Sequence, residues 1–106
     1  MTTGIRVIIT KAGDVSAITT EPMHAVEPAE GEVRIKVAYA GINFADLLMR
    51  LGFYLPRPPF PFTPGYEVSG VVDALGKGVT GLEVGQRVVA AMRTGGQASF
   101  VNAPVD

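Results

Sequence analysis

The stretch that decides the fold is residues 40–54, which read Ala-Gly-Ile-Asn-Phe-Ala-Asp-Leu-Leu-Met-Arg-Leu-Gly-Phe-Tyr. Residues 43–51 are the only good helix candidate in the sequence. Asn43 is a suitable N-cap, because its side-chain oxygen can accept from a first-turn amide. Asp46 then lies near the positive end of the helix dipole, and Gly52 is well placed to end the helix. One apolar face is expected from residues at helical spacing: Phe44, Leu47, Leu48 and Leu51.

A proline-rich segment follows this helix. Five of the nine residues from 56 to 64 are proline, which excludes a helix or a central strand. We expect a stiff, extended loop, since proline leaves little backbone entropy to lose. The loop is either a rigid connector or one wall of a cleft that presents Phe60 and Phe62 to a ligand or partner. The sequence leaves both interpretations open.

Short runs of valine and isoleucine between glycines and prolines make up the rest of the chain. The 13 glycines and 8 prolines exceed a fifth of the residues, which is typical of short strands joined by tight turns in a barrel or sandwich. Residues 32–39 form the clearest strand, and its alternation predicts one buried face. That face comprises Val33, Ile35, Val37 and Tyr39. Further strands are predicted at residues 5–10, 17–20, 66–73 and 86–91, and 97–102 can pair back after Gly95-Gly96.

Composition and charge exclude several functional classes. The length predicts one domain, residues 1–106. The net charge of −1 and the scattered basic residues argue against a nucleic-acid partner, and no apolar run approaches the roughly 20 residues of a membrane span. The absence of cysteine excludes thiolate metal sites and fits a reducing compartment, so we expect a cytoplasmic protein. The single histidine, His24, is expected on the surface.

No complete catalytic or nucleotide-binding motif is present. The sequence contains no Gly-x-Gly-x-x-Gly and no P-loop. With one histidine, no Ser/His/Asp set is credible.

The order of segments nonetheless resembles the N-terminal, GroES-like domain of the medium-chain dehydrogenase/reductase superfamily. The resemblance covers nearly the whole chain, and its motifs are weak singly but specific in their order and spacing. They are Pro28-x-x-Gly31-Glu32-Val33-x-Ile35, Gly41-Ile42-Asn43-Phe44-Ala45-Asp46, Gly52-Phe53-Tyr54, Pro64-Gly65-Tyr66-Glu67-x-x-Gly70-Val71-Val72, Val84-Gly85-Gln86-Arg87-Val88-Val89-Ala90 and Gly95-Gly96-Gln97-Ala98-x-Phe100-Val101. The resemblance implies a mainly β fold: a GroES-like, partly open β-barrel with one short helix at about residues 43–52 and the proline-rich loop.

Two positions separate this chain from the zinc-dependent members of the superfamily. Those members carry a Cys at the position matching Asn43 and a His at the position matching Tyr66. An amide and a phenol are poor substitutes for thiolate and imidazole on Zn²⁺, so we expect no metal site. The Asn-x-x-Asp formed by Asn43 and Asp46 is similar to the zinc-free quinone oxidoreductase branch. Leu48 stands where some quinone reductases carry a second tyrosine, which leaves the quinone specificity open.

Members of that branch transfer a hydride from NADPH to a quinone or an activated alkene. The resemblance implies catalytic roles for Asn43 and Tyr54, which would donate hydrogen bonds at the substrate pocket, and cofactor contacts from Asn43 and Asp46. Structural roles stay open beside these: Asn43 as an N-cap only, Tyr54 as a packing residue and Asp46 as a brace for the helix start. Glu67 is expected to be a buried structural acid rather than a base.

In this superfamily the cofactor binds between the GroES-like domain and a Rossmann domain. The sequence stops at Asp106, about where a Rossmann domain would begin. We therefore expect the substrate-side domain of an NADPH-dependent quinone or enone oxidoreductase, which neither binds NADPH tightly nor reacts on its own. One alternative is a stand-alone interaction or co-chaperonin-like module without catalysis. Another is self-association through exposed apolar surface, including Phe60 and Phe62.

Overall fold

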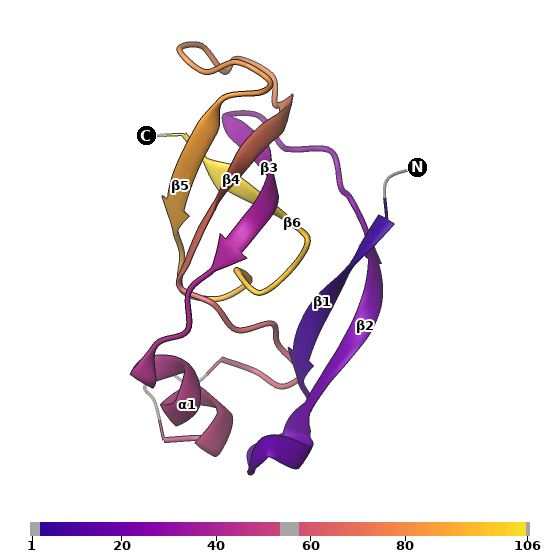
Figure 1. Cartoon of the computed structure of the whole chain (residues 1–106), viewed down its shortest axis with the longest axis vertical. Helices are drawn as coiled ribbons and strands as arrows, with labels where there is room; N and C mark the ends of the chain where they lie inside the picture. Colours follow the sequence, from indigo (N-terminus) through magenta and orange to yellow (C-terminus); the bar gives the residue numbers. More distant parts are fainter. Residues whose placement is uncertain (1–2, 54–57, 106) are drawn as a thin grey trace.

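The chain forms two antiparallel β-sheets and one α-helix in the computed structural model, which describes residues 3–53 and 58–105 (Figure 1). A two-stranded sheet pairs β1 with β2, and a four-stranded sheet has the order β5-β4-β3-β6. Both sheets are open, which confirms the mainly β, partly open fold. The elements are β1 (Thr3–Ile9), a short 3₁₀ turn (Val15–Ala17), β2 (Ile18–His24), β3 (Glu32–Ala40), α1 (Phe44–Leu51), β4 (Glu67–Leu75), β5 (Arg87–Ala91) and β6 (Phe100–Pro104).

The short segment 97–99 ties the two sheets together. The Val7 amide donates to the Gln97 carbonyl, and the Ser99 amide donates to the Ile5 carbonyl, both at 2.9 Å. On the other side, the Val37 amide of β3 donates to the Ser99 carbonyl at 2.9 Å. The segment after the double glycine therefore pairs back as predicted, but onto β1 and β3 rather than onto the strand before the turn. Because both sheets are bonded to it, this segment connects the β1–β2 hairpin to the four-stranded sheet.

Two separate apolar clusters make up the core. The first lies inside the four-stranded sheet and includes Ile35, which is 1% exposed, and the fully buried Val72. Complete burial of such a side chain contributes roughly 1.5–3 kcal/mol. The second cluster lies under α1 and consists of Ile9, Ala17, Met49 and Phe62.

The proline-rich loop contributes to this second cluster. Phe62 is buried there, and Phe60 packs beside it with 5.5 Å between the ring centroids. The Phe62 amide and carbonyl also bond to Ile9 of β1 at 3.2 and 2.8 Å. Phe62 is therefore not presented on the surface, whereas Phe60 is only half-buried.

Helix α1 begins and ends where the sequence predicted. Asn43 is its N-cap, and Gly52 adopts the left-handed conformation, with φ 84°, that closes the C-terminus. The predicted apolar face is wrong, however. Asp46 and Met49 are the buried residues of the helix, whereas Phe44 is 72% exposed.

Hydrogen bonds between α1 and the loop after β1 explain which face of the helix is buried. The Gly13 amide donates to the Arg50 carbonyl, and the Arg50 Nη1 atom donates back to the Gly13 carbonyl, both at 2.9 Å. These bonds fix α1 against the loop after β1 and turn Met49 into the second cluster. Phe44 and Leu47 consequently remain on the surface.

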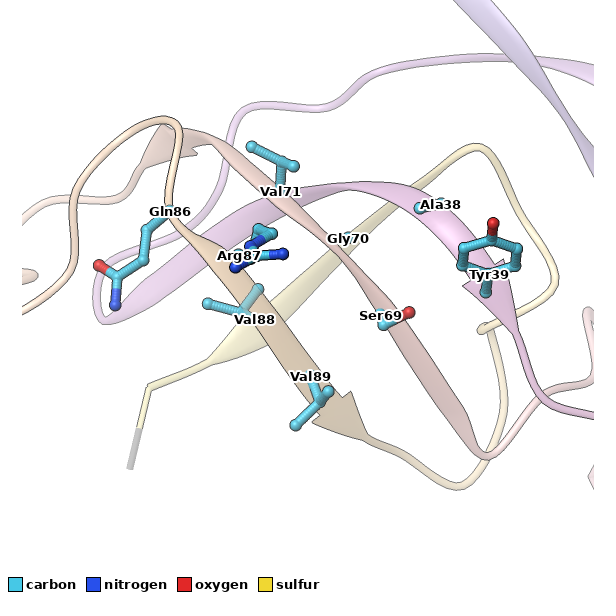
Figure 2. A pocket seen from close by; sticks show the side chains of 9 residues that line it. All are labelled: Ala38, Tyr39, Ser69, Gly70, Val71, Gln86, Arg87, Val88 and Val89. Carbon is cyan, nitrogen blue, oxygen red and sulfur yellow. The ribbon is translucent and has the colours of Figure 1, made fainter.

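A β-bulge in β3 turns Tyr39 out of the core. Val37 lies opposite Gly70 and Tyr39 lies opposite Ser69, so Ala38 is an extra residue without a partner on β4. One inserted residue reverses the inward–outward alternation of a strand. Tyr39, predicted to share the buried face with Val37, is instead 78% exposed on the outer face of the sheet (Figure 2).

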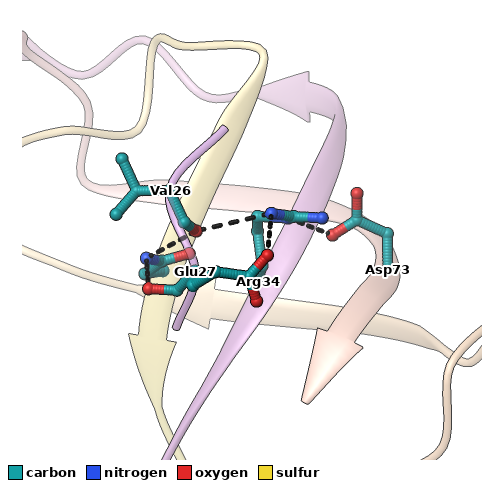
Figure 3. A network of polar contacts seen from close by, with 5 residues as sticks. Val26, Glu27, Arg34 and Asp73 are labelled. Carbon is teal, nitrogen blue, oxygen red and sulfur yellow. Dashed lines mark hydrogen bonds and ion pairs between the residues drawn. The ribbon is translucent and has the colours of Figure 1, made fainter. Parts of the chain in front are cut away.

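A second irregularity, on β4, holds the loop after β2 in place. Asp73 is the extra residue there, and its carboxylate accepts from Arg34 Nε at 2.7 Å (Figure 3). The Arg34 guanidinium also reaches the Val26 carbonyl at 3.5 Å and lies 5.9 Å from the centre of the Phe100 ring. Arg34 thus joins β3, β4, β6 and the loop before β3.

Candidate functional site

A pocket of about 250 Å³ opens beside the N-terminal half of α1. Its walls come from the helix, from the β1–β2 hairpin and from the two loops that contain Pro64 and Gln97. Mostly apolar walls with a few convergent polar groups are typical of small-molecule sites. The lining residues are Ile9, Ile18, Ile42, Asn43, Asp46, Leu47, Arg50, Pro64 and Gln97.

Asn43 holds its position at this pocket through the local backbone. It is the N-cap of α1, with an extended conformation at φ −122° and ψ 158°. Its Nδ2 atom donates to Glu67 Oε1 over a long 3.4 Å. Glu67 is exposed at the start of β4, so the expectation of a buried structural acid is wrong. The side-chain amide of Asn43 therefore has only a weak acceptor and is available to donate to a better one.

Asp46 is the buried polar side chain of the site and is 8% exposed. Its Oδ2 atom accepts from the backbone N–H of Asn43 at 2.9 Å. Its Oδ1 atom makes no hydrogen bond within the described part of the chain. Buried polar atoms are nearly always hydrogen-bonded in folded proteins, so Oδ1 is a ready acceptor for an N–H or O–H group of a ligand.

The structure brings together two of the three site residues that the sequence indicated. Asn43 and Asp46 line the same pocket, whereas Tyr54 lies outside the described residues. Tyr66, at the second zinc-ligand position, is half-buried and packs against the cluster under α1. The walls supplied by Ile18 and Gln97 were missed, because no local signal in the sequence links such distant segments.

The described residues contain no group of three or more His, Cys, Asp or Glu side chains that could hold a metal ion. His24 is exposed on β2, as predicted. In the ranges 3–53 and 58–105, no helix has the length and apolar character needed to cross a membrane.

Comparison with known proteins places this geometry in a family. Residues 29–104 match the family described as Alcohol dehydrogenase GroES-like domain. The synaptic vesicle membrane protein VAT-1 homolog of Rattus norvegicus is 39% identical over 99 residues, which are 92% of this chain and 24% of that protein.

Two solved structures share the fold. The human VAT-1 homolog-like protein superposes with a TM-score of 0.93 and 35% identity, over 98% of this chain and 33% of that one. The quinone oxidoreductase of Escherichia coli, solved in complex with NADPH, gives 0.81 and 32%, over 92% of this chain and 30% of that one.

These relatives are much longer than the present chain, which spans about a quarter to a third of their length. The matched residues include the whole of α1 and the Asn43–Asp46 pair. The chain therefore belongs to the alcohol dehydrogenase GroES-like domain family, within the medium-chain dehydrogenase/reductase group that includes the quinone oxidoreductases and the VAT-1 homologs.

Proposed function

We propose that this chain is the substrate-side domain of an NADPH-dependent quinone or enone oxidoreductase, and that it requires a nucleotide-binding domain for activity. The observation that carries the proposal is that the weakly held side-chain amide of Asn43 and an Asp46 oxygen without a hydrogen-bond partner among the described residues lie beside one pocket. The quinone oxidoreductase of Escherichia coli, which was solved with NADPH, supports the same assignment.

The polar groups of the pocket fit the nicotinamide end of such a cofactor. The nicotinamide supplies a hydride when bound. Asp46 Oδ1 would accept a hydrogen bond from a carboxamide N–H group, and this bond would satisfy the buried oxygen. Since Asp46 Oδ2 is already bonded to the Asn43 backbone, the carboxylate is held in place without a ligand. We therefore assign Asp46 to cofactor positioning.

Asn43 is the proposed donor to the acceptor oxygen. Negative charge develops on that oxygen as a quinone or enone is reduced, and a fixed amide in a mostly apolar pocket stabilises it. Ile9, Ile42 and Leu47 line the same pocket and give it apolar walls beside Asn43. Asn43 belongs to both the cofactor and the acceptor side of the site. Tyr54 is proposed as a second donor at the pocket edge.

We further propose that the reaction uses no zinc, because the amide of Asn43 and the phenol of Tyr66 are poor Zn²⁺ ligands. The lack of cysteine also favours a reducing compartment such as the cytoplasm.

A chimera tests the function. This chain would replace the matching part of the Escherichia coli quinone oxidoreductase, and NADPH oxidation would be measured with a quinone acceptor. The Asn43→Ser variant keeps a good N-cap but loses the amide donor, so kcat should fall about 100-fold. The matched control is Asn102→Ser, since the Asn102 amide bonds to the Val26 carbonyl and lies outside the pocket.

Two results would contradict the proposal. Full activity of the Asn43→Ser chimera would reduce Asn43 to a helix cap. Micromolar binding of NADPH by the 106-residue chain alone would remove the need for a second domain.

A further inference from the structure

Glu67 lies behind the side-chain amide of Asn43, outside the pocket. β3 ends at Ala40, and the Gly41 amide donates to the Glu67 carbonyl at 3.0 Å, which extends the pairing of β3 with β4 by one residue. The Glu67 Oε1 atom accepts from Asn43 Nδ2 at 3.4 Å. Glu67 is not one of the described residues that line the pocket of about 250 Å³. Its carboxylate therefore reaches the chemistry of the pocket through Asn43.

The absence of a side chain at Gly41 makes room for this contact. A Cβ atom built on Gly41 would lie 2.5 Å from Glu67 Oε1 and 2.8 Å from Glu67 Cγ. Both distances are shorter than real Cβ atoms approach other heavy atoms. The Glu67 side chain thus occupies the space that a side chain at position 41 would need, and it crosses the bare backbone there to reach Asn43.

An asparagine amide needs such a partner to have one orientation. Its last torsion is broad and roughly two-fold, and its NH₂ and C=O ends differ in hydrogen-bonding character. The N-cap backbone of Asn43 fixes where the side chain begins, and the turn of the amide is a separate variable. An ionised carboxylate can only accept, so Glu67 favours the orientation in which the NH₂ group faces it. The amide nitrogen carries two hydrogens, and the second one remains for a ligand.

We propose that Glu67 is a positioning residue, which turns the Asn43 amide so that one N–H is held and the other donates to the acceptor oxygen. This inference rests on the function proposed above for Asn43. Catalytic hydrogen bonds are often long before a substrate binds and shorten in the reactive complex, and the 3.4 Å separation allows such a change.

The charge of Glu67 acts against its orienting effect. A carboxylate near a developing negative oxygen destabilises that charge, whereas an oriented N–H donor stabilises it. Glu67→Gln removes the charge and keeps an acceptor oxygen, while Glu67→Ala removes both. The two variants therefore separate orientation from charge.

The chimera described above provides the activity test, with NADPH oxidation measured at saturating quinone. Glu67→Ala should lower kcat about tenfold and leave the KM for NADPH unchanged, because it removes one hydrogen bond to a charged group. Glu67→Gln should stay within about threefold of the parent kcat, since an acceptor remains. The matched control is Glu83→Ala, which should keep the parent kcat, because Glu83 is exposed in the loop before β5 and lies outside the pocket.

Double variants show whether Glu67 acts through Asn43. In the Asn43→Ser chimera, Glu67→Ala should cause no further loss of kcat, since the group that it orients is already absent. Gly41→Ala places a methyl group against the Glu67 carboxylate and should displace that flexible side chain. It should therefore lower kcat in the parent chimera and have no added effect in the Glu67→Ala chimera.

Nuclear magnetic resonance of the 106-residue chain gives a readout without turnover. The hydrogen-bonded side-chain proton of Asn43 should lose its downfield shift in Glu67→Ala and keep it in Glu67→Gln. Circular dichroism would establish that each variant is folded.

The outcomes distinguish this inference from the proposed function. Full activity of the Asn43→Ser chimera would overturn both. A loss of activity in Asn43→Ser together with parent activity in Glu67→Ala would overturn the inference alone. The same conclusion follows if Glu67→Gln loses as much activity as Glu67→Ala, or if Glu67→Ala lowers kcat equally in the presence and absence of Asn43.

Discussion

Gly70 is the position at which a single methyl group should do the most damage to the four-stranded sheet. A Cβ atom built there would lie 2.2 Å from the Lys36 carbonyl oxygen and 2.9 Å from Ile35 Cγ2. The first contact is with backbone, so no side-chain rotation relieves it. We predict that Gly70→Ala is severely destabilising.

The geometry sets the size of the effect. Restoring even a tight contact of 3.0 Å requires β3 and β4 to separate by about 0.8 Å, which lengthens neighbouring hydrogen bonds beyond their normal range. Overpacking of a well-packed interior costs about 1–3 kcal/mol, and each lost hydrogen bond adds about 1 kcal/mol. The expected loss is therefore about 3–5 kcal/mol, against a total stability of about 5–15 kcal/mol for a typical domain.

Urea denaturation followed by far-ultraviolet circular dichroism measures this loss, since the chain has no tryptophan. The matched control is Gly78→Ala. Gly78 has a φ of +81°, but a Cβ atom at this position would have no neighbouring atom within 4 Å, so only backbone strain of about 1 kcal/mol is expected. If Gly70→Ala loses no more stability than Gly78→Ala, the close approach of β3 and β4 is not a rigid constraint and the reasoning fails.

Two further predictions concern the core and the loop after β1. Ile35→Ala should lose about 2–5 kcal/mol and Ile35→Val only about 0.5–1.5 kcal/mol; equal losses in the same denaturation assay would show that the cluster collapses around the cavity. Hydrogen bonds from the Ser16 hydroxyl, at 2.6 Å, and from the Ser16 amide lower the pKa of Asp14 below its ordinary value of 3.8. Because the folded-state pKa is depressed, the stabilisation is complete above that ordinary value and is lost as the pH falls through the folded-state pKa. Ser16→Ala should raise the pKa of Asp14 in a nuclear magnetic resonance titration, and an unchanged pKa would contradict this assignment.

The bounds of α1 could be predicted from sequence because their signals are local. An N-cap residue and a left-handed glycine act through the first and last turns of the helix, and both were correctly predicted at Asn43 and Gly52. The buried face could not be predicted in the same way. It depends on the hydrogen bonds between Arg50 and Gly13, and sequence spacing carries no information about that contact.

In the sheet, too, local features could be predicted from the sequence and features that depend on distant contacts could not. The alternation of β3 was correct as far as Val37 and failed at Tyr39, because the bulge at Ala38 arises from the way β3 meets β4. In the candidate site, Asn43 and Asp46 lie one helical turn apart, so their proximity follows from local geometry. The walls at Ile18 and Gln97 come from opposite parts of the sequence, and only the completed fold brings them together.

The junction at residues 97–99 has a consequence for how the chain folds. Ile5 and Ser99 are bonded although 94 positions separate them, so β1 cannot reach its final place until residues 97–99 are available to pair with it. Contacts of such long sequence separation slow folding, since loop-closure entropy is lost before they form. Removal of residues after 96 would free Ile5 and Val7 of β1 and take away the pocket wall at Gln97, while the Ile9–Phe62 bonds would still hold the hairpin. The candidate site is thus completed only after residues 97–99 have paired with β1.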